Sequence, residues 1–405
     1  MRPDWDVVVI GGGIIGLATA YQLLVAGPDL RVLVLEKEPR VGLHQSSHNS
    51  GVLHAGLYYA PDSLKARLCS RGRRRMEEFA ADHGIPVVRR GKVVVAVDES
   101  ELGRLDELAH RARRNGVEGL RMLDTAELRE LEPHVVGIKA LYSSSTAVID
   151  FSLVCEALAN EISARGGEIR THAEVLALRE VRSAVRITSL AGEFESETAV
   201  VCAGLQADRL AAETGHATGV RILPFRGNWF SLRPRAAALV NGNVYPVPDP
   251  RFPFLGVHFT RRVDGSVWAG PNAIVSACRE AYQRGTVNPA DIADLVRFRG
   301  TWRLVRRYWR QGAKELYHDL VRRAAHAEMV RYLPGLALAD LLPGPTGIRA
   351  QAVRDDGSLV DDFLLRGTRR IVHVLNAPSP GATSSLAIGE LIGAEVGEKV
   401  RLARA

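Results

Sequence analysis

The first 36 residues alternate apolar runs with a glycine-rich turn in an order typical of a nucleotide-binding unit. Residues 7–10 form an uninterrupted apolar run, residues 11–16 a glycine-rich turn, and residues 17–25 a helical stretch. A second apolar run, residues 31–35, ends at Glu36. The pattern predicts strand, turn, helix, strand and acid, the βαβ layout of a dinucleotide site. A glycine turn in an ordinary α/β protein is the alternative.

Three glycines of this turn have separate expected tasks. Gly11 permits the tight turn, Gly13 lets the backbone approach a pyrophosphate, and Gly16 lets the helix pack close to the strand. The helix N-terminus, with Ile15 in its first turn, faces the phosphate charge. Glu36 is expected to accept hydrogen bonds from a ribose diol and to repel a 2′-phosphate. Lys37, which follows Glu36, is the last predicted cofactor contact of this unit.

The middle of the chain departs from this pattern and later returns to it. After a polar stretch at residues 42–59, the periodicity predicts a basic helix (63–83), a strand (92–97) and two helices (101–115 and 125–132), the second capped by Thr125. From residue 150 the alternation resumes with a helix (151–165) and strands (168–171, 174–178 and 198–202). This second half predicts a resumed parallel sheet with supporting strands.

The C-terminal half inserts a different kind of structure before a final return. Short β-type runs at 228–232, 255–259 and 266–269 are separated by Pro, Gly and Asp turns, which indicates an antiparallel sheet. Residues 290–332 are helical and basic, residues 371–376 form a strand, and a helix begins at residue 386. We therefore predict an α/β fold, with a discontinuous Rossmann-like domain (1–85, 150–220 and 345–405) interleaved with an antiparallel-sheet substrate domain (86–149 and 221–344). Such interleaving favours a permanently held FAD over NAD.

Composition places the chain among ordinary globular proteins, with one local anomaly. Its 405 residues are 46% hydrophobic and 24% charged, and its four cysteines are scattered without metal-ligand spacing, so we expect reduced thiols and a cytoplasmic protein. The first strand begins too early for a signal peptide, and no apolar run is long enough to span a bilayer. The net charge of +7 equals the excess of ten Lys/Arg over three acids within residues 297–331. The basic excess is therefore local.

Six stretches together resemble one enzyme family: HQSSHNSGVLHAGLYY (44–59), PFRG (224–227), YPVPD (245–249), PFLGVHFT (253–260), GIRAQA (347–352) and NAPSP (376–380). They are similar to the L-2-hydroxyglutarate oxidase/dehydrogenase family, within the flavoenzymes that resemble D-amino-acid and glycine oxidases. Departures are Gly381, where the family often has Ala, and Asn228, where an aromatic or acidic residue is common. The resemblance implies non-covalent FAD and oxidation of L-2-hydroxyglutarate to 2-oxoglutarate by hydride transfer to flavin N5. Electrons then pass to a non-NAD acceptor, a quinone or O₂.

The resemblance also implies further cofactor contacts. Val175 is expected beside the adenine, and the small pair Ala203 and Gly204 close to the cofactor. Loop residues expected around the flavin are Ser47, Asn49, Ser50, Gly51 and Val52. Amides at the start of the last helix would stabilise negative charge growing at the flavin N1/C2 carbonyl as hydride arrives; they belong to Gly381, Ala382 and Thr383.

Oxidising an alcohol beside a carboxylate requires a hydride acceptor, a base and cations. The flavin supplies the acceptor. His54 is the predicted base because the resemblance places its loop against the isoalloxazine and an imidazole titrates near neutrality. His54 could instead only hydrogen-bond the loop or the flavin. His48, in the same loop, and His258, which could orient substrate, stay open as alternatives.

L-2-hydroxyglutarate is a dianion, so two cationic subsites are expected. A guanidinium binds a carboxylate through two parallel hydrogen bonds. Arg226 in PFRG and Arg349 in GIRAQA are the predicted substrate arginines, although most arginines of so basic a chain are solvated surface residues. Tyr58 and Lys65 are weaker candidates, for which core or surface roles compete.

Two rival hypotheses remain open at this stage. An FAD-dependent amine oxidase of the glycine/sarcosine type would share the FAD elements without needing His54. Separately, arginines interleave with Trp302, Tyr308 and Trp309 in the segment 297–331, a pattern that suits peripheral contact with an anionic membrane. A solvated face packed through its aromatics explains the same pattern. Nucleic acid is not expected as a partner because no recognition module accompanies the basic segment.

Overall fold

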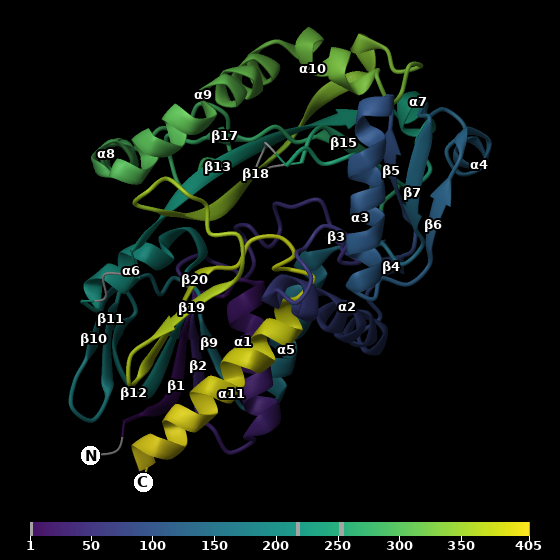
Figure 1. The fold of residues 1–405 in the computed structure, drawn as a ribbon. Coiled ribbons are helices and arrows are strands. Elements are labelled where there is room, and N and C mark those ends of the chain that lie inside the picture. The colour runs from purple at the N-terminus through teal and green to yellow at the C-terminus, as the bar shows by residue number, and fades with distance from the viewer. Residues whose placement is uncertain (1–2, 216–218, 251–254, 405) are drawn as a thin grey trace.

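The computed structural model describes residues 3–215, 219–250 and 255–404 and is built around two large sheets (Figure 1). In the first sheet, β1 (Trp5–Ile10) lies between β2 (Val32–Leu35) and β12 (Gly192–Val201), parallel to both. Its parallel neighbours continue outward as β9 (Glu168–Arg170) and β20 (Ile371–Asn376). Antiparallel additions are β10 (Val175–Glu180), β11 (Val185–Ser189) and β19 (Leu364–Gly367). The predicted discontinuous Rossmann-like sheet is confirmed.

Burial on both faces explains why β1 reads as an unbroken apolar run. Val7 and Val9 face one hydrophobic cluster, whereas Val8 and Ile10 face another. The first cluster includes side chains of the helices α1 (Ile14–Ala26), α5 (Phe151–Ala164) and α11 (Ser385–Arg404). Figure 1 shows α11, in yellow, running alongside α1 on this side of the sheet. Packing on both faces therefore fixes the positions of the strand ends.

The second sheet is mixed rather than purely antiparallel, because β14 (Asn243–Pro246) pairs in parallel with β5 (Lys92–Ala96). Its other strands pair antiparallel: β6 (Leu120–Leu123), β7 (Lys139–Ser143), β13 (Val220–Leu232), β15 (His258–Arg261), β16 (Val267–Gly270), β17 (Ile274–Val275) and β18 (Leu341–Arg354).

Two details of the sequence interpretation differ from the structure here, and a third falls partly outside the described residues. The predicted boundary at residue 345 falls inside β18, which pairs with β13 along both strands. The strand expected at 255–259 begins at His258. Residues 253 and 254 of the quoted PFLGVHFT stretch lie outside the described residues. The division of the chain into two domains otherwise stays a prediction.

The remaining elements surround the two sheets. A small sheet joins β3 (Val52–Leu53), β4 (Val87–Val88) and β8 (Ala147–Ile149). Helical elements are α2 (Leu64–Asp82), η1 (Glu99–Glu101), α3 (Leu102–Arg114), α4 (Thr125–Leu131), η2 (Gly204–Gln206), α6 (Ala207–Glu213), α7 (Pro234–Ala237), α8 (Pro289–Arg297), α9 (Arg299–Leu320), α10 (Arg322–Met329) and η3 (Leu338–Asp340).

Helix α4 shows how a cap can be misplaced by one residue. Asp124, not Thr125, is its N-cap: the Asp124 carboxylate accepts the N–H groups of Ala126 and Glu127, while Glu127 reaches back to the Asp124 N–H. This reciprocal capping box satisfies more donors than a threonine hydroxyl would. Among the described residues, no helix is both long and apolar enough to cross a membrane.

Candidate active site

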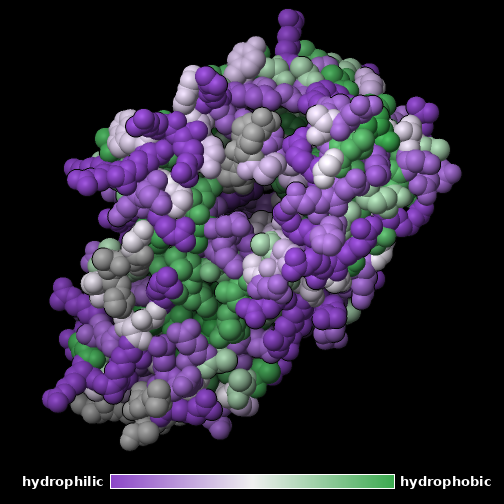
Figure 2. Space-filling model, viewed as in Figure 1, coloured by the Kyte–Doolittle hydropathy of each residue, from purple (hydrophilic) through white to green (hydrophobic). Residues whose placement is uncertain are grey.

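A cavity of about 650 Å³ lies between the two large sheets and is lined by residues from both. This volume is within the roughly 300–1,000 Å³ range of ligand and cofactor pockets. Figure 2 shows a hollowed face of the molecule with hydrophobic side chains gathered beside the hollow. The carboxyl ends of β1 and β2 contribute the glycine turn and Glu36, which is where parallel sheets bind ligands.

The glycine turn has no room for side chains at two of its positions. Gly11 has φ +107, and a Cβ there would lie 2.5 Å from the Cys202 carbonyl oxygen. A Cβ at Gly16 would lie 2.0 Å from the Gly11 oxygen. Gly11 and Gly13 line the cavity, whereas Gly16 does not. Gly16 therefore acts by letting α1 pack against the strand end.

The N-terminus of α1 points its backbone donors toward the cavity wall. Its N-cap Gly13 offers no side-chain cap, and the Ile14 N–H donates to Ser46 Oγ at 2.9 Å. Gly13 and Ile15 line the cavity. A helix start at the wall of a cavity is suited to an anionic group such as a pyrophosphate.

Glu36 is fixed at the end of β2 by two backbone donors. One carboxylate oxygen accepts the Gly12 N–H at 2.7 Å, and the other accepts the Glu38 N–H at 2.9 Å. The residue is 6% exposed and lines the cavity, with acceptor capacity left for a ribose hydroxyl. Next to it, Lys37 lines the cavity and pairs with Glu280 at 2.5 Å.

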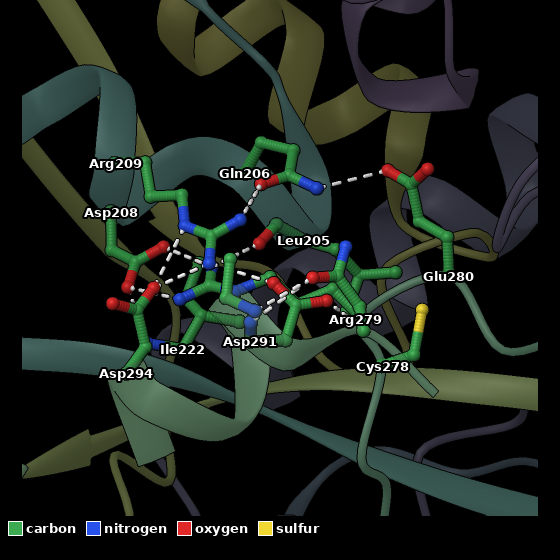
Figure 3. Close-up of polar contacts among 12 residues, drawn as sticks. Leu205, Gln206, Asp208, Arg209, Ile222, Cys278, Arg279, Glu280, Asp291 and Asp294 are labelled. Carbon is green, nitrogen blue, oxygen red and sulfur yellow. Dashed lines mark hydrogen bonds and ion pairs between the residues drawn. The ribbon is translucent and has the colours of Figure 1, made fainter. Parts of the chain in front are cut away.

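A charged network connects this end of the cavity to the second sheet's side of the molecule (Figure 3). The side chains of Arg279 and Asp208 form a buried ion pair. The backbone N–H of Arg279 donates to the Asp291 carboxylate at 2.7 Å. Arg209 also binds Asp291 at 2.7 Å and lines the cavity. Because breaking a buried pair leaves an uncompensated charge, this network holds α6 firmly against the loop before α8.

The loop 44–52 mixes lining residues with residues that brace the loop. Asn49, Ser50 and Val52 line the cavity. Ser47 does not, because its hydroxyl donates to the His44 carbonyl oxygen at 3.2 Å. Gly51 lies behind the wall with φ +72, where a Cβ would approach the Ile149 oxygen to 2.7 Å. These two predicted flavin contacts are therefore placed in supporting positions.

The other predicted cofactor residues all reach the cavity from distant segments. Val175 comes from β10, Ala203 and Gly204 follow β12, and the turn before α11 contributes Gly381, Ala382 and Thr383. Segments nearly two hundred residues apart thus meet at one cavity because their strands are neighbours in the first sheet.

His54 lines the cavity directly after β3 and is held through both its backbone and its ring. Its backbone N–H donates to Thr383 Oγ1 at 3.1 Å, and its ring Nε2 lies 3.3 Å from Ser379 Oγ. Burial, and after it the nearby positive charges of Lys92 and Arg349, hold the pKa of His54 well below its usual value. The ring therefore stays neutral and able to accept a proton at neutral pH.

Two other predicted residues join His54. His258 lines the cavity, and its Nδ1 lies 2.9 Å from the Gly256 carbonyl oxygen, while burial lowers the pKa of His258 to about 4. Arg349 lines the cavity from β18, and burial lowers its pKa to about 10, so it stays cationic at neutral pH. His48 also lines the cavity, and its ring lies tilted against that of Tyr282, with ring centres 4.2 Å apart.

Arg226 is not placed at the cavity, which corrects the prediction of a second substrate arginine. Its guanidinium pairs with Asp319 of α9 at 3.1 Å. Strand alternation explains the difference: in β13, Phe225 and Gly227 face the cavity and Arg226 faces away. Arg349 lies opposite Phe225 in the sheet register and so shares the cavity face.

Tyr58 and Lys65 are likewise not among the lining residues. Tyr58 lies behind the wall, and its buried hydroxyl has no hydrogen-bond partner within the described part of the chain. Lys65 pairs with Asp361 at 3.2 Å.

The sequence interpretation missed several lining residues, notably Trp229, Tyr245 and Asn272. Period-two alternation along β13 could have found Trp229, because it follows Phe225 and Gly227 on the same face. Tyr245 stacks on His258, with ring centres 4.1 Å apart. Asn272 belongs to a loop, for which no periodic signal exists.

Charges are distributed unequally along the cavity. Among the described lining residues, the carboxylates are Glu36, Glu174, Glu213 and Glu280, which surround the glycine-turn end. The lining residues drawn from 42–54, 225–273 and 347–383 include no carboxylate and present Arg349, His54 and His258. The cradle at the glycine turn fits a dinucleotide, and the other end suits an anion.

Comparison with known proteins agrees with this geometry. A profile described as FAD dependent oxidoreductase (DAO) matches residues 6–395. The mitochondrial L-2-hydroxyglutarate dehydrogenase of Caenorhabditis elegans is 43% identical over 410 residues, 99% of this chain and 95% of the relative. The L-2-hydroxyglutarate dehydrogenase of Escherichia coli K12 is 43% identical over 97% of this chain and 93% of the relative. The resemblance carried by the six stretches is confirmed, as is FAD as the cofactor.

Solved structures share the fold at lower identity. The FAD-bound L-alpha-glycerophosphate oxidase of Mycoplasma pneumoniae superposes with a TM-score of 0.79 at 24% identity, covering 99% of this chain and 95% of that one. Glycine oxidase of Geobacillus kaustophilus gives a TM-score of 0.72 at 21% identity, covering 97% and 95%. These likenesses support the fold.

Proposed function

The chain belongs to the FAD dependent oxidoreductase family, and from this premise we propose that it oxidises L-2-hydroxyglutarate to 2-oxoglutarate. Relatives named as L-2-hydroxyglutarate dehydrogenases match nearly its whole length. The observation that carries the proposal is the carboxylate-free end of the cavity, where Arg349 and two histidines meet. A doubly anionic substrate is favoured there and a zwitterionic amino acid has no acid to bind its ammonium group.

The proposed mechanism divides three tasks among this chain's residues and the cofactor. FAD, when held by the glycine turn and Glu36, supplies the acceptor for the electron pair that leaves the substrate α carbon. Arg349 binds a substrate carboxylate through its guanidinium. Neutral His54 takes the hydroxyl proton as the Cα–H bond breaks, which forms the C=O bond of the product. Ser379 contacts the imidazole at Nε2, and Thr383 anchors the backbone N–H of His54.

The turnover experiment uses the purified holoenzyme with an artificial dye as electron acceptor. L-2-hydroxyglutarate is expected to reduce the dye with stoichiometric formation of 2-oxoglutarate, whereas D-2-hydroxyglutarate, glycine and sarcosine are expected to be inactive. Faster turnover with glycine or sarcosine would replace the proposal with the amine-oxidase alternative. The physiological acceptor, proposed as a quinone or O₂, follows from comparing O₂ consumption with reduction of a soluble quinone.

A second proposal concerns α9, which we infer contacts an anionic membrane surface. Its Trp302 and Trp309 are each 58% exposed, and Leu320 is 73% exposed. The helix is kinked at Tyr308; at 3.6 residues per turn Trp302 shares a face with Val305 before the kink, and Trp309 shares a face with Leu316 and Leu320 after it. Exposed arginines lie along the neighbouring face: Arg299, Arg306, Arg307 and Arg310. An apolar stripe beside a basic one matches the interface of an anionic bilayer.

Sedimentation with vesicles tests this contact directly. The holoenzyme is expected to co-sediment with phosphatidylserine-containing vesicles at low salt and much less with purely zwitterionic ones. The double variant W302S/W309S is expected to lose binding, and L190S, which changes a side chain that is 66% exposed elsewhere, serves as the matched control. Equal binding by all three proteins would remove the proposal and leave α9 as a solvated face.

A further inference from the structure

Lys92 lies at the end of a strand face that is otherwise apolar. It is the first residue of β5, and strand alternation puts it on the same face as Val94 and Ala96, which pack in one cluster with Tyr245. The residue is 1% exposed. Among the residues that the structure describes, no carboxylate forms an ion pair with its ammonium group. A cation taken out of water in this way is costly without an opposite charge nearby.

Aromatic rings connect the ammonium to the cavity. Lys92 Nζ lies 4.0 Å from the ring centre of Tyr245 and 5.2 Å from that of Tyr58. Tyr245 lines the cavity and stacks on His258, which lines it too. Cation–π contacts offset part of the desolvation cost. They do not replace a negative charge.

The displacement of Arg226 from the cavity leaves a dianionic substrate with one guanidinium, Arg349, at this end. We propose that Lys92 supplies the second positive charge, acting through the wall formed by Tyr245 and His258 to select a doubly charged ligand. The inference rests on the proposed function and assigns Lys92 to specificity. Lys92 is a positioning residue, because its ammonium group acts on the substrate electrostatically across Tyr245 and His258 without touching it.

The charge of Lys92 affects the two histidines that line the cavity. Burial is the main cause of the lowered pKa of His54 and of His258, and the charge of Lys92 lowers both further. Burial lowers the pKa of Lys92 itself to about 7, against an opposing effect of Cys69. A dianion bound in the cavity raises that pKa again, so ligand binding near pH 8 draws a proton onto Lys92. His54 and His258 stay neutral at that pH, while Arg349 is already charged.

Binding of unreactive ligands separates this proposal from the oxidation itself. Glutarate is a five-carbon dianion and pentanoate the matching monoanion, and each is titrated into the holoenzyme while the flavin absorbance is followed. K92M is expected to weaken glutarate binding about tenfold or more while leaving pentanoate binding unchanged. K92R is expected to restore most of the preference. K139M removes a lysine from the neighbouring strand β7, where it pairs with Asp106, and is the matched control.

Proton uptake by the wild-type enzyme keeps the test independent of any folding defect in K92M. Glutarate binding near pH 8, measured in buffers of different ionisation enthalpy, is expected to take up protons, and pentanoate binding to take up fewer. The proposal would be overturned if K92M lost the same affinity for glutarate as for pentanoate. It would also be overturned if glutarate bound without proton uptake. If glutarate shows both effects but L-2-hydroxyglutarate gives no turnover, the proposed function fails while the dianion site stands.

Discussion

The two ends of the cavity differ in how they are built and in the charge they present. At the glycine-turn end, one contiguous segment supplies the strand, turn, helix start and Glu36, and carboxylates are frequent. At the other end, His54, His258 and Arg349 come from three separate elements, and no carboxylate accompanies them in the described lining. The first end suits a ribose and a pyrophosphate held by backbone donors. The second suits a substrate that carries carboxylates.

The difference teaches that cofactor binding and substrate binding depend on different levels of structure. The glycine turn depends on local backbone geometry, so its failure should abolish the cofactor site outright. The reacting end depends on the register of β13 against β18, which sets which side chains face the cavity. Substitutions there should change kinetics while leaving the cofactor bound.

The largest expected effect comes from filling the space at the glycine turn. G16V places side-chain atoms where a Cβ alone would lie 2.0 Å from the Gly11 oxygen, so we expect the protein to lose FAD or fail to fold. Flavin absorbance per protein after purification measures this. G103A is the matched control, since a Cβ at Gly103 meets nothing within 4 Å. A yellow, stoichiometric G16V protein would refute the close-packing role.

Removing the cavity guanidinium should give the next largest effect. R349M is expected to lower kcat/KM for L-2-hydroxyglutarate by about 10²-fold or more, since losing one partner of a buried charge pair costs about 2–5 kcal/mol. R226M breaks the pair with Asp319 away from the cavity and is expected to lower stability without raising KM. Steady-state kinetics and thermal unfolding of both variants measure this. A large fall in kcat/KM for R226M, with little change for R349M, would restore Arg226 as the substrate arginine.

Replacing the proposed base tests the chemistry at the same end. H54A is expected to keep its FAD and to slow flavin reduction by about 10²-fold or more, the usual contribution of a positioned base. Rapid mixing under anaerobic conditions gives the reduction rate. Near-normal reduction would transfer the role to His258 or His48.

The smallest expected effect is a displaced pH profile. Because burial and neighbouring cations lower the pKa of His54, its neutral form persists below the usual histidine range. We therefore expect no decline of kcat/KM as pH falls through about 6.5, the ordinary histidine pKa, and a decline only below it. Initial rates at limiting substrate across the pH range measure the midpoint. A midpoint at or above the ordinary value would argue against the cationic surroundings of His54.

The sequence predicts the glycine-turn end well because its information is local. The run at 7–10, the glycine spacing and Glu36 lie within one βαβ unit, and the structure places each of them as expected. The interleaving of the two sheets also follows from the return of apolar strand patterns after residue 150. Local patterns give the start of α4 to within one residue: Asp124, not Thr125, is the N-cap, because Asp124 and Glu127 form reciprocal hydrogen bonds.

The reacting end is only partly predictable, for a reason visible in two residues. Arg226 and Arg349 stand in equally distinctive motifs, yet they lie on opposite faces of one sheet. A one-residue difference in register decides which of them reaches the cavity, and register is set by tertiary pairing. Lys92 was missed because a lysine opening an apolar strand is ordinarily a solvated strand end.

Anaerobic mixing of the purified holoenzyme with one equivalent of L-2-hydroxyglutarate tests the central claim most directly. The account predicts that the oxidised flavin absorbance bleaches in a single turnover, and that the D-enantiomer and the monoanion L-2-hydroxybutyrate bleach it far more slowly. An absorbance that stays unchanged with L-2-hydroxyglutarate, in protein with a full complement of FAD, would contradict it.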